Sequence, residues 1–241
     1  MDFLAFLSAS DAVRAHRTLE KMRLHRIDAL VLTGGMAIEL HMMKHVSANE
    51  ERPLNDIDFL VDSFDDIPKT LGADFRFRHV HPNDPPGKTL LQCVDPETAV
   101  RVDIFRACGT AVARAVPMEL DGATMRTISI EDLASYTVRL CMDLAANTPM
   151  PAKHAEDLLR LLPVLDLVAA ELAWRKNRKA NHPETFRSAV DLVMDSIATR
   201  KDLQFVPIYS HDVEQRCSRC RETENFPLAC AKQILAILGY C

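Results

Sequence analysis

The sequence Asp28-Ala-Leu-Val-Leu-Thr33-Gly34-Gly35, followed at residues 56–62 by Asp-Ile-Asp-Phe-Leu-Val-Asp, decides how this chain folds. Residues 28–33 are a short apolar run that ends at two glycines, which predicts a buried strand that meets a turn. Residues 36–45 then predict a helix packed on that strand. Residues 56–62 begin with alternating acidic and apolar side chains, the period of a second strand.

The rest of the chain extends this pattern in two stages. Further strands are predicted at residues 75–80, 89–94, 100–105 and 125–129. Helices are predicted from Ser10 or Asp11, at 65–71, and then at 131–146, 152–168 and 184–200. We therefore expect an α/β (α+β) fold: a small mixed sheet with flanking helices in residues 1–129, a helical C-terminal domain in 130–201, and a Cys-containing tail in 202–241.

Composition narrows the class of protein. The 241 residues hold 29 Lys and Arg against 34 Asp and Glu, a net charge of -5, so a globally basic nucleic-acid coat is excluded. No apolar run approaches the ~20 residues that span a bilayer, and Asp2 stands where a signal peptide carries Lys or Arg. We expect a cytoplasmic protein without a membrane partner. Its 7 cysteines are then thiols or metal ligands.

Polar chemistry gathers at the ends of the predicted strands. Two glycines after a strand let a ligand approach the backbone, and the following helix offers free N–H groups to phosphate. Asp56 and Asp58 are two apart on a strand, so both carboxylates lie on one face. Adjacent carboxylates repel each other unless a cation lies between them, and Mg²⁺ prefers oxygen ligands. Asp103, on strand 100–105, supplies a third acid.

The order of these motifs resembles the nucleotidyltransferase (polymerase-beta-like) superfamily. Within it, the chain is most similar to the minimal, AbiEii-like branch, which includes toxins of bacterial toxin–antitoxin systems. Residues 32–41, 52–60 and 102–105 carry the likeness, and the motifs cover roughly residues 28–160. The branch usually has a hydroxyl residue where this chain has Leu54.

The resemblance implies a transfer of a nucleoside monophosphate from an NTP to an acceptor, with Mg²⁺ (or Mn²⁺) as cofactor and pyrophosphate as product. Asp56, Asp58 and Asp103 are the implied metal ligands and catalytic residues, and Asp103 would help to activate the acceptor hydroxyl. The implied nucleotide-binding residues are Thr33, Gly34, Gly35, Arg52, Lys153 and Asp157.

Lys153 and Asp157 are four residues apart and share one face of a predicted helix. In the functional interpretation Lys153 meets the nucleotide phosphates and Asp157 orients it. In the ordinary interpretation they form a surface ion pair of little energetic weight.

Further patterns outside the motifs have a functional and an ordinary interpretation. His211, Cys217, Cys220 and Cys230 are a candidate structural zinc site, because one Cys-x-x-Cys pair is present, or else reduced thiols. Residues 174–179 are a basic cluster with one tryptophan, suited to RNA or to a solvated helix end. His41 and His45 are a possible metal pair or ordinary helix histidines, and Cys93, Cys108 and Cys141 are expected in the core.

Three functions remain open from the sequence. The first is an Mg²⁺-dependent nucleotidyltransferase acting on RNA, protein or a small molecule. The second is a non-catalytic nucleotide-binding or scaffold relative of the same fold. The third is an AbiEii-like toxin that modifies RNA, for example tRNA, and is restrained by an antitoxin protein. The base preference, the acceptor and the oligomeric state are not determined by the sequence.

Overall fold

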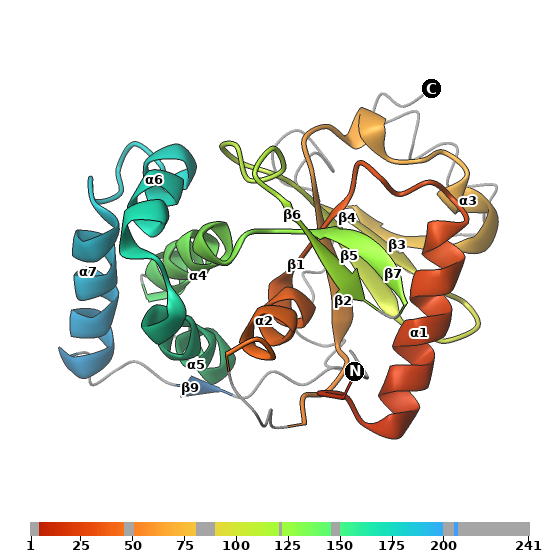
Figure 1. Cartoon of the computed structure of the whole chain (residues 1–241), viewed down its shortest axis with the longest axis horizontal. Helices are drawn as coiled ribbons and strands as arrows, with labels where there is room; N and C mark the ends of the chain where they lie inside the picture. Colours follow the sequence, from red (N-terminus) through yellow and green to blue (C-terminus); the bar gives the residue numbers. More distant parts are fainter. Residues whose placement is uncertain are drawn as a thin grey trace.

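The structure is a computed structural model that describes residues 5–45, 51–80, 90–120, 122–145, 150–199 and 205–206. Its first part is a mixed sheet flanked by helices, and its second part is a group of helices on one side of that sheet (Figure 1). The described strands form a seven-stranded sheet in the order β3-β4-β5-β2-β1-β7-β6 and a separate pair, β8-β9. The predicted α/β fold is confirmed.

The centre of the sheet is built from the strands that the sequence predicted. The seven strands are β1 (Val31–Thr33), β2 (Asp56–Val61), β3 (Arg76–Val80), β4 (Leu90–Val94), β5 (Arg101–Arg106), β6 (Val116–Leu120) and β7 (Ala123–Thr127). β2 runs parallel to β5 and antiparallel to β1, while β1 runs parallel to β7. Both β2 and β5 are therefore interior strands, and Ile57 and Ile104 on them are fully buried.

Two helices cover opposite faces of the sheet (Figure 1). Helix α1 (Ala9–Arg23) begins after Ser8, whose hydroxyl accepts a hydrogen bond from the Asp11 amide at 3.1 Å. It buries Ala15, Leu19 and Met22, which recur at helical spacing. Helix α2 (Gly34–Met42) begins directly at the end of β1 and lies on the other face, toward the C-terminal helices.

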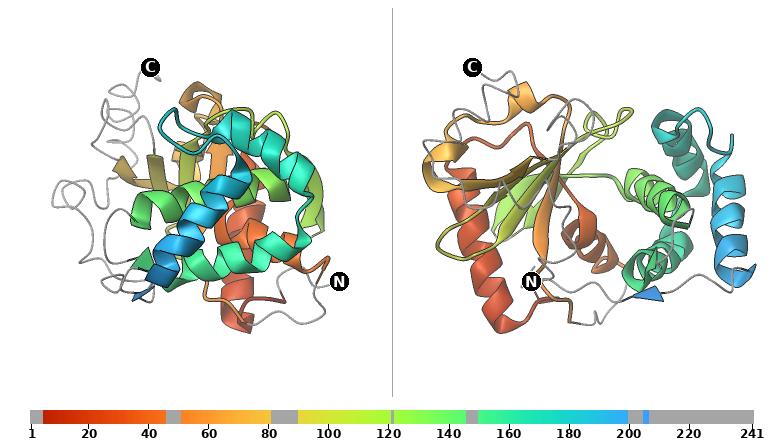
Figure 2. Two further views of the ribbon diagram at one scale, coloured as in Figure 1. Left: turned by 90° about the vertical axis from the view of Figure 1, so that its left-hand side faces the viewer. Right: turned by 180° about the vertical axis from the view of Figure 1, so that it is seen from behind.

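The C-terminal helices pack around α4. They are α4 (Ile130–Ala145), α5 (Ala152–Leu161), α6 (Leu167–Asn177) and α7 (Phe186–Thr199). Helix α4 contacts all three of the others, and both α4 and α5 contact α2, which joins this group to the sheet (Figure 2). Strands β8 (Met150–Pro151) and β9 (Phe205–Val206) pair in parallel beside α5.

Two predicted helices have wrong bounds, and one strand was not predicted. The predicted helix 152–168 stops at Leu161, since Pro163 cannot continue it, and a 3-10 turn leads to α6. The helix predicted at 65–71 is a 3-10 turn at Phe64–Asp66 and a separate short helix, α3 (Leu71–Asp74). Strand β6 was not predicted. None of the helices in the described part of the chain has the length and apolar content to cross a bilayer.

Candidate active site

Strand register places four polar side chains in one row across the sheet. Asp58 on β2 lies opposite Thr33 on β1 and opposite Asp103 on β5. Asp103 in turn lies opposite Gln92 on β4. Directly opposite residues point to the same face of a sheet, so this row collects polar groups from four strands above a sheet whose other positions are largely apolar.

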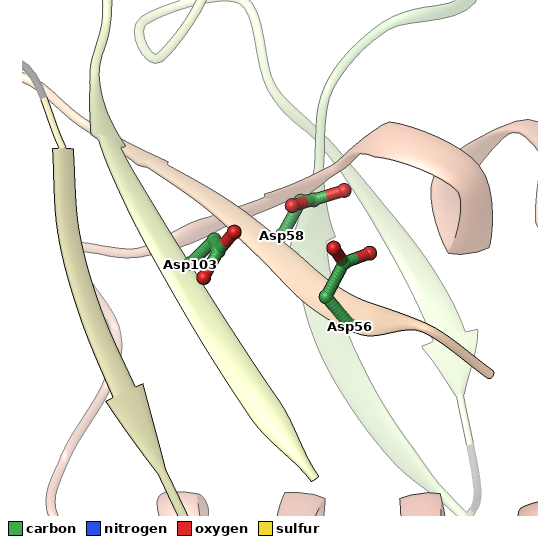
Figure 3. A group of neighbouring side chains, drawn as sticks. All are labelled: Asp56, Asp58 and Asp103. Atoms are coloured by element: carbon green, nitrogen blue, oxygen red, sulfur yellow. The ribbon is translucent and has the colours of Figure 1, made fainter. Parts of the chain in front are cut away.

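The three predicted acids converge on this face. Asp56 and Asp58 extend from β2 and Asp103 from β5, and each offers a carboxylate oxygen within 4.8 Å of those of the other two (Figure 3). Asp103 is 5% exposed, whereas Asp56 and Asp58 are half-buried. Three oxygens at this separation are a donor set of the kind that a hard divalent cation takes.

The glycine turn closes directly on this cluster. Gly34 has a φ of +64°, a conformation that other residues adopt at a cost. A Cβ atom at this position would lie 1.9 Å from Oδ2 of Asp58, so only glycine fits. The close approach of backbone and carboxylate explains why the glycine and the Asp58 strand occur together in the sequence.

Arg101, which the sequence analysis did not single out, is the cation that these carboxylates contact. It lies opposite Asp56 in the β2–β5 register and forms an ion pair with it. Its Nε atom is 3.3 Å from a carboxylate oxygen of Asp103. The sequence did contain a signal for Arg101, because Arg101 and Asp103 are two residues apart on one strand and therefore lie on the same face of the sheet. Gln92 was also missed, and its side-chain amide donates a hydrogen bond to Asp103 at 2.8 Å.

Electrostatics at the cluster favour a bound cation. Burial, followed by the negative charges of Asp56 and Asp103, raises the pKa of Asp58 well above its ordinary value. The positive charges of Lys153 and Arg101 act in the opposite direction. A carboxylate under this repulsion gains more from a divalent cation than a solvated one does.

A cleft of about 600 Å³ opens from the acids toward the C-terminal helices. Thr33, Gly34 and Gly35 line it at the start of α2, and Lys153 lines it from α5. Thr33 precedes the first turn of α2 without capping it through its side chain, so the first N–H groups of this helix have no side-chain cap. Lys153 is half-buried, and its positive charge acts on Asp58.

Asp157 is paired differently from the prediction. Both of its carboxylate oxygens accept hydrogen bonds from Arg52, at 2.9 and 3.1 Å, and it is not the partner of Lys153. Arg52 also donates to Glu39 at 2.9 Å. The interpretation of Lys153 and Asp157 as a helix-surface pair is therefore wrong, because the half-buried guanidinium of Arg52 binds Asp157 instead. A role of Asp157 in nucleotide binding stays a prediction. A contact of Arg52 with phosphate stays a prediction, with its guanidinium held by two carboxylates here.

The far wall of the cleft belongs to α4. Leu133, Tyr136, Thr137 and Leu140 line it at the spacing of one helix face. Arg139 extends beside them and lies over the ring of Tyr136, 5.6 Å from its centre.

Two residues lining the cleft differ from ordinary core positions. Cys108 contacts Arg139 and lines the cleft, so it is not the core cysteine that we expected, unlike the buried Cys93 and Cys141. Burial, with the nearby charge of Lys153, lowers the pKa of His154 to about 4, which keeps its imidazole neutral at physiological pH.

The remaining candidates fall elsewhere. His211, Cys217, Cys220 and Cys230, the candidate zinc ligands, lie outside the described residues. His41 is buried and hydrogen-bonded to the Ile128 carbonyl at 2.7 Å, as a helix histidine in the core. In the basic cluster 174–179, Trp174 is fully buried, and its indole N–H donates to the Pro183 carbonyl at 2.9 Å. The aromatic part of that cluster therefore belongs to the helix packing.

Several solved structures resemble this chain at low sequence identity. No family model matches the sequence, and no curated protein matches it. A crystal structure of ANT(2'')-Ia in complex with adenylyl-2''-tobramycin is 18% identical with a TM-score of 0.45, over 66% of this chain and 94% of that one. A solution structure of the antibiotic-resistance factor ANT(2'')-Ia is 16% identical with a TM-score of 0.45, over 83% of this chain and 100% of that one.

A third similar structure is an antigenic nucleotidyltransferase-like protein from Paracoccidioides brasiliensis. It is 14% identical with a TM-score of 0.41, over 66% of this chain and 78% of that one. The resemblance to the superfamily rests on the sequence motifs, and the narrower resemblance to the AbiEii-like branch stays a prediction.

Proposed function

We propose that this chain is a nucleotidyltransferase that transfers a nucleoside monophosphate from an NTP to an acceptor. The observation that carries the proposal is the convergence of Asp56, Asp58 and Asp103 within 4.8 Å, directly against the Gly34 turn. Asp58 is the acid nearest to this turn, because a Cβ at Gly34 would lie 1.9 Å from its Oδ2 atom.

The acids fit a divalent cation by their chemistry, since they offer three carboxylate oxygens at one place. Mg²⁺ or Mn²⁺ bound there would neutralise phosphate charge and make the acceptor oxygen more nucleophilic. Asp56, Asp58 and Asp103 would hold it, in exchange for the contacts that Arg101 makes with two of them.

The other residues of the cleft would bind the triphosphate and position the reacting atoms. The first N–H groups of α2, at Gly34 and Gly35, face an anion favourably, and Lys153 supplies a positive charge from the opposite side. The acceptor oxygen forms a bond to the α-phosphorus, and the bond from that phosphorus to pyrophosphate breaks. We assign the acceptor's proton to the carboxylate of Asp103, which Gln92 orients through its amide.

The charges of the cleft favour an anionic acceptor. Beyond the three acids, the only carboxylate among its described lining residues is Asp157, which Arg52 binds. Arg106 and Arg139 line the same cleft. A cationic amino sugar would find few carboxylates here, whereas RNA would find cations for its phosphates. This supports RNA as the acceptor rather than tobramycin, whose adenylyl derivative is bound in the ANT(2'')-Ia crystal structure. The toxin and antitoxin hypothesis stays a prediction.

The test is to incubate the protein with each α-labelled NTP and Mg²⁺, and with total RNA, total protein or tobramycin as acceptor. Label is expected on RNA, and Asp56→Ala and Asp58→Ala are expected to abolish it while circular dichroism stays unchanged. Glu20→Gln, which removes an exposed carboxylate 3.2 Å from His16 on α1, is the matched control. Label on tobramycin would refute the acceptor, and undiminished label with Asp58→Ala would refute the mechanism.

The non-catalytic alternative is separated by thermal unfolding with and without ligands. A nucleotide-binding relative without turnover would be stabilised by NTP, yet it would release no pyrophosphate with any acceptor. Growth arrest on expression that depends on Asp58 would support the toxin hypothesis.

A further inference from the structure

Four charged side chains form a partly buried network beside the cleft, which one of them, Asp157, lines. Glu39 on α2 is 1% exposed and accepts hydrogen bonds from two guanidiniums. Arg160 binds both of its oxygens at 2.7 Å, and Arg52 binds one at 2.9 Å. Arg52 binds Asp157 as well, through two nitrogens. We call Glu39, Arg52, Asp157 and Arg160 the Glu39 network.

The network joins the three segments that carry the candidate site. Glu39 is on α2, about one turn after the glycines. Arg52 is four residues before Asp56, and its guanidinium lies so close to Gly35 that a Cβ there would be 2.9 Å from it. Asp157 and Arg160 are on α5, where Lys153 is one turn before Asp157. No other described ion pair connects α2 with α5.

The energetics of such a network are better suited to fixing geometry than to adding stability. The attraction within a buried ion pair is little larger than the free-energy cost of removing both charges from water. Bidentate contacts between guanidinium and carboxylate, however, define distance and orientation together. Burial alone would raise the pKa of Glu39, but the hydrogen bonds from Arg160 and Arg52 outweigh it and lower the pKa, so Glu39 stays ionised.

We propose that the Glu39 network positions Lys153 against the glycine turn and the three acids, so that its members are positioning residues for the nucleotide. This rests on the proposed function insofar as Lys153 is the residue that meets the phosphates. Without the network, α5 keeps its apolar contacts through Leu158 and Leu161 but loses the bonds that set its position along α2.

The test is a double-mutant cycle between Glu39→Gln and Lys153→Ala, read by equilibrium binding of Mg·NTP and by kcat and KM. Glu39→Gln alone is expected to weaken NTP binding about tenfold, or about 1.4 kcal/mol. It is expected to lower kcat/KM by about 10- to 100-fold, the scale of an ångström misplacement. In the Lys153→Ala background, Glu39→Gln is expected to change neither quantity further.

Two additional variants separate positioning from loss of folding. Arg52→Lys keeps the charge but not the bidentate geometry, so binding is expected to fall between those of the parent and Glu39→Gln. Glu20→Gln, which makes the same change at an exposed glutamate on α1, is expected to leave NTP binding unchanged. Independent, multiplicative effects of Glu39→Gln and Lys153→Ala would overturn the proposal, as would parent-like binding by a folded Glu39→Gln protein.

The binding arm distinguishes this proposal from the proposed function. If the parent binds Mg·NTP and shows the coupling but transfers no nucleotide to any acceptor, the positioning role stands and the transferase activity fails. If the parent transfers nucleotide but the coupling is absent, the transferase activity stands and the positioning role fails. A parent that binds no NTP refutes both.

Discussion

Replacing Gly34 by alanine tests the geometry on which the candidate site depends. An L-residue at a φ of +64° costs about 1–2 kcal/mol in backbone energy. The new Cβ would also displace Asp58. Its carboxylate would have to retreat by about 1.5 Å, the difference between the 1.9 Å separation and the 3.4 Å at which ordinary contact begins. A shift of about 1 Å at a reacting centre lowers rates by about 100-fold, so we expect a loss of at least that size.

Gly122 provides a matched control. It has a φ of +72°, and a Cβ there would meet nothing within 4 Å. Gly122→Ala is therefore expected to pay the same backbone cost of about 1–2 kcal/mol and to keep its activity. Urea unfolding of the metal-free proteins measures the backbone cost. Nucleotide transfer and the thermal shift produced by Mg²⁺ measure the displacement of Asp58. If Gly34→Ala matches Gly122→Ala in transfer and in Mg²⁺ response, the reasoning is refuted.

Three further predictions concern charged groups. The imidazole of His154 is expected to titrate near pH 4 in an NMR experiment, and a midpoint near 6.5 would contradict this. The protein is expected to lose stability as pH falls from 6.5 to 4, because the unfolded state takes up the proton first. Arg101→Gln is expected to destabilise the protein by about 3 kcal/mol in EDTA, because two carboxylates lose their cation. Mg²⁺ is expected to recover part of this stability. Equal unfolding midpoints of the variant in EDTA and in Mg²⁺ would argue against it. Asp95 is fully buried, and its carboxylate lies 2.7 Å from Nζ of Lys21. Asp95→Asn is therefore expected to lower the free energy of unfolding by about 3 kcal/mol at pH 7, measured by urea unfolding, and to leave NTP binding, measured by titration, unchanged. Burial alone would raise the pKa of Asp95, but the bond from Lys21 outweighs it and lowers the pKa, so the cost is expected to shrink as pH falls below about 4.

The candidate acids were predictable from sequence because local rules place them. Alternation on a strand puts Asp56 and Asp58 on one face, and a strand that ends in two glycines predicts the close approach beside them. The same rule applied to Arg101 and Asp103 would have identified the arginine. It was overlooked because a search for metal ligands considers acids and passes over the cation beside them.

The ion pairs of Arg52, strand β6 and helix α6 could not be predicted, because they depend on contacts between distant parts of the chain or have weak local signals. Arg52 and Asp157 are 105 residues apart, and no spacing rule connects them. Strand β6 contains Pro117, which argues against a strand, yet β6 is at the edge of the sheet, where a missing N–H is tolerated. Helix α6 has a nearly even distribution of apolar residues, with Leu167, Val168 and Leu172 exposed, so its periodicity is faint.

The register between β2 and β5 has a consequence for how the chain matures. The aspartates that face each other across these strands are 45 positions apart in sequence, and the segment between them contributes two other strands of the sheet. A nascent chain that ends before residue 101 would carry the glycine turn and Asp56 and Asp58, but not the third acid of the cation site. The complete set of three acids therefore forms only after β5 has been synthesised, and any proteolytic fragment that ends before β5 would be expected to lack it.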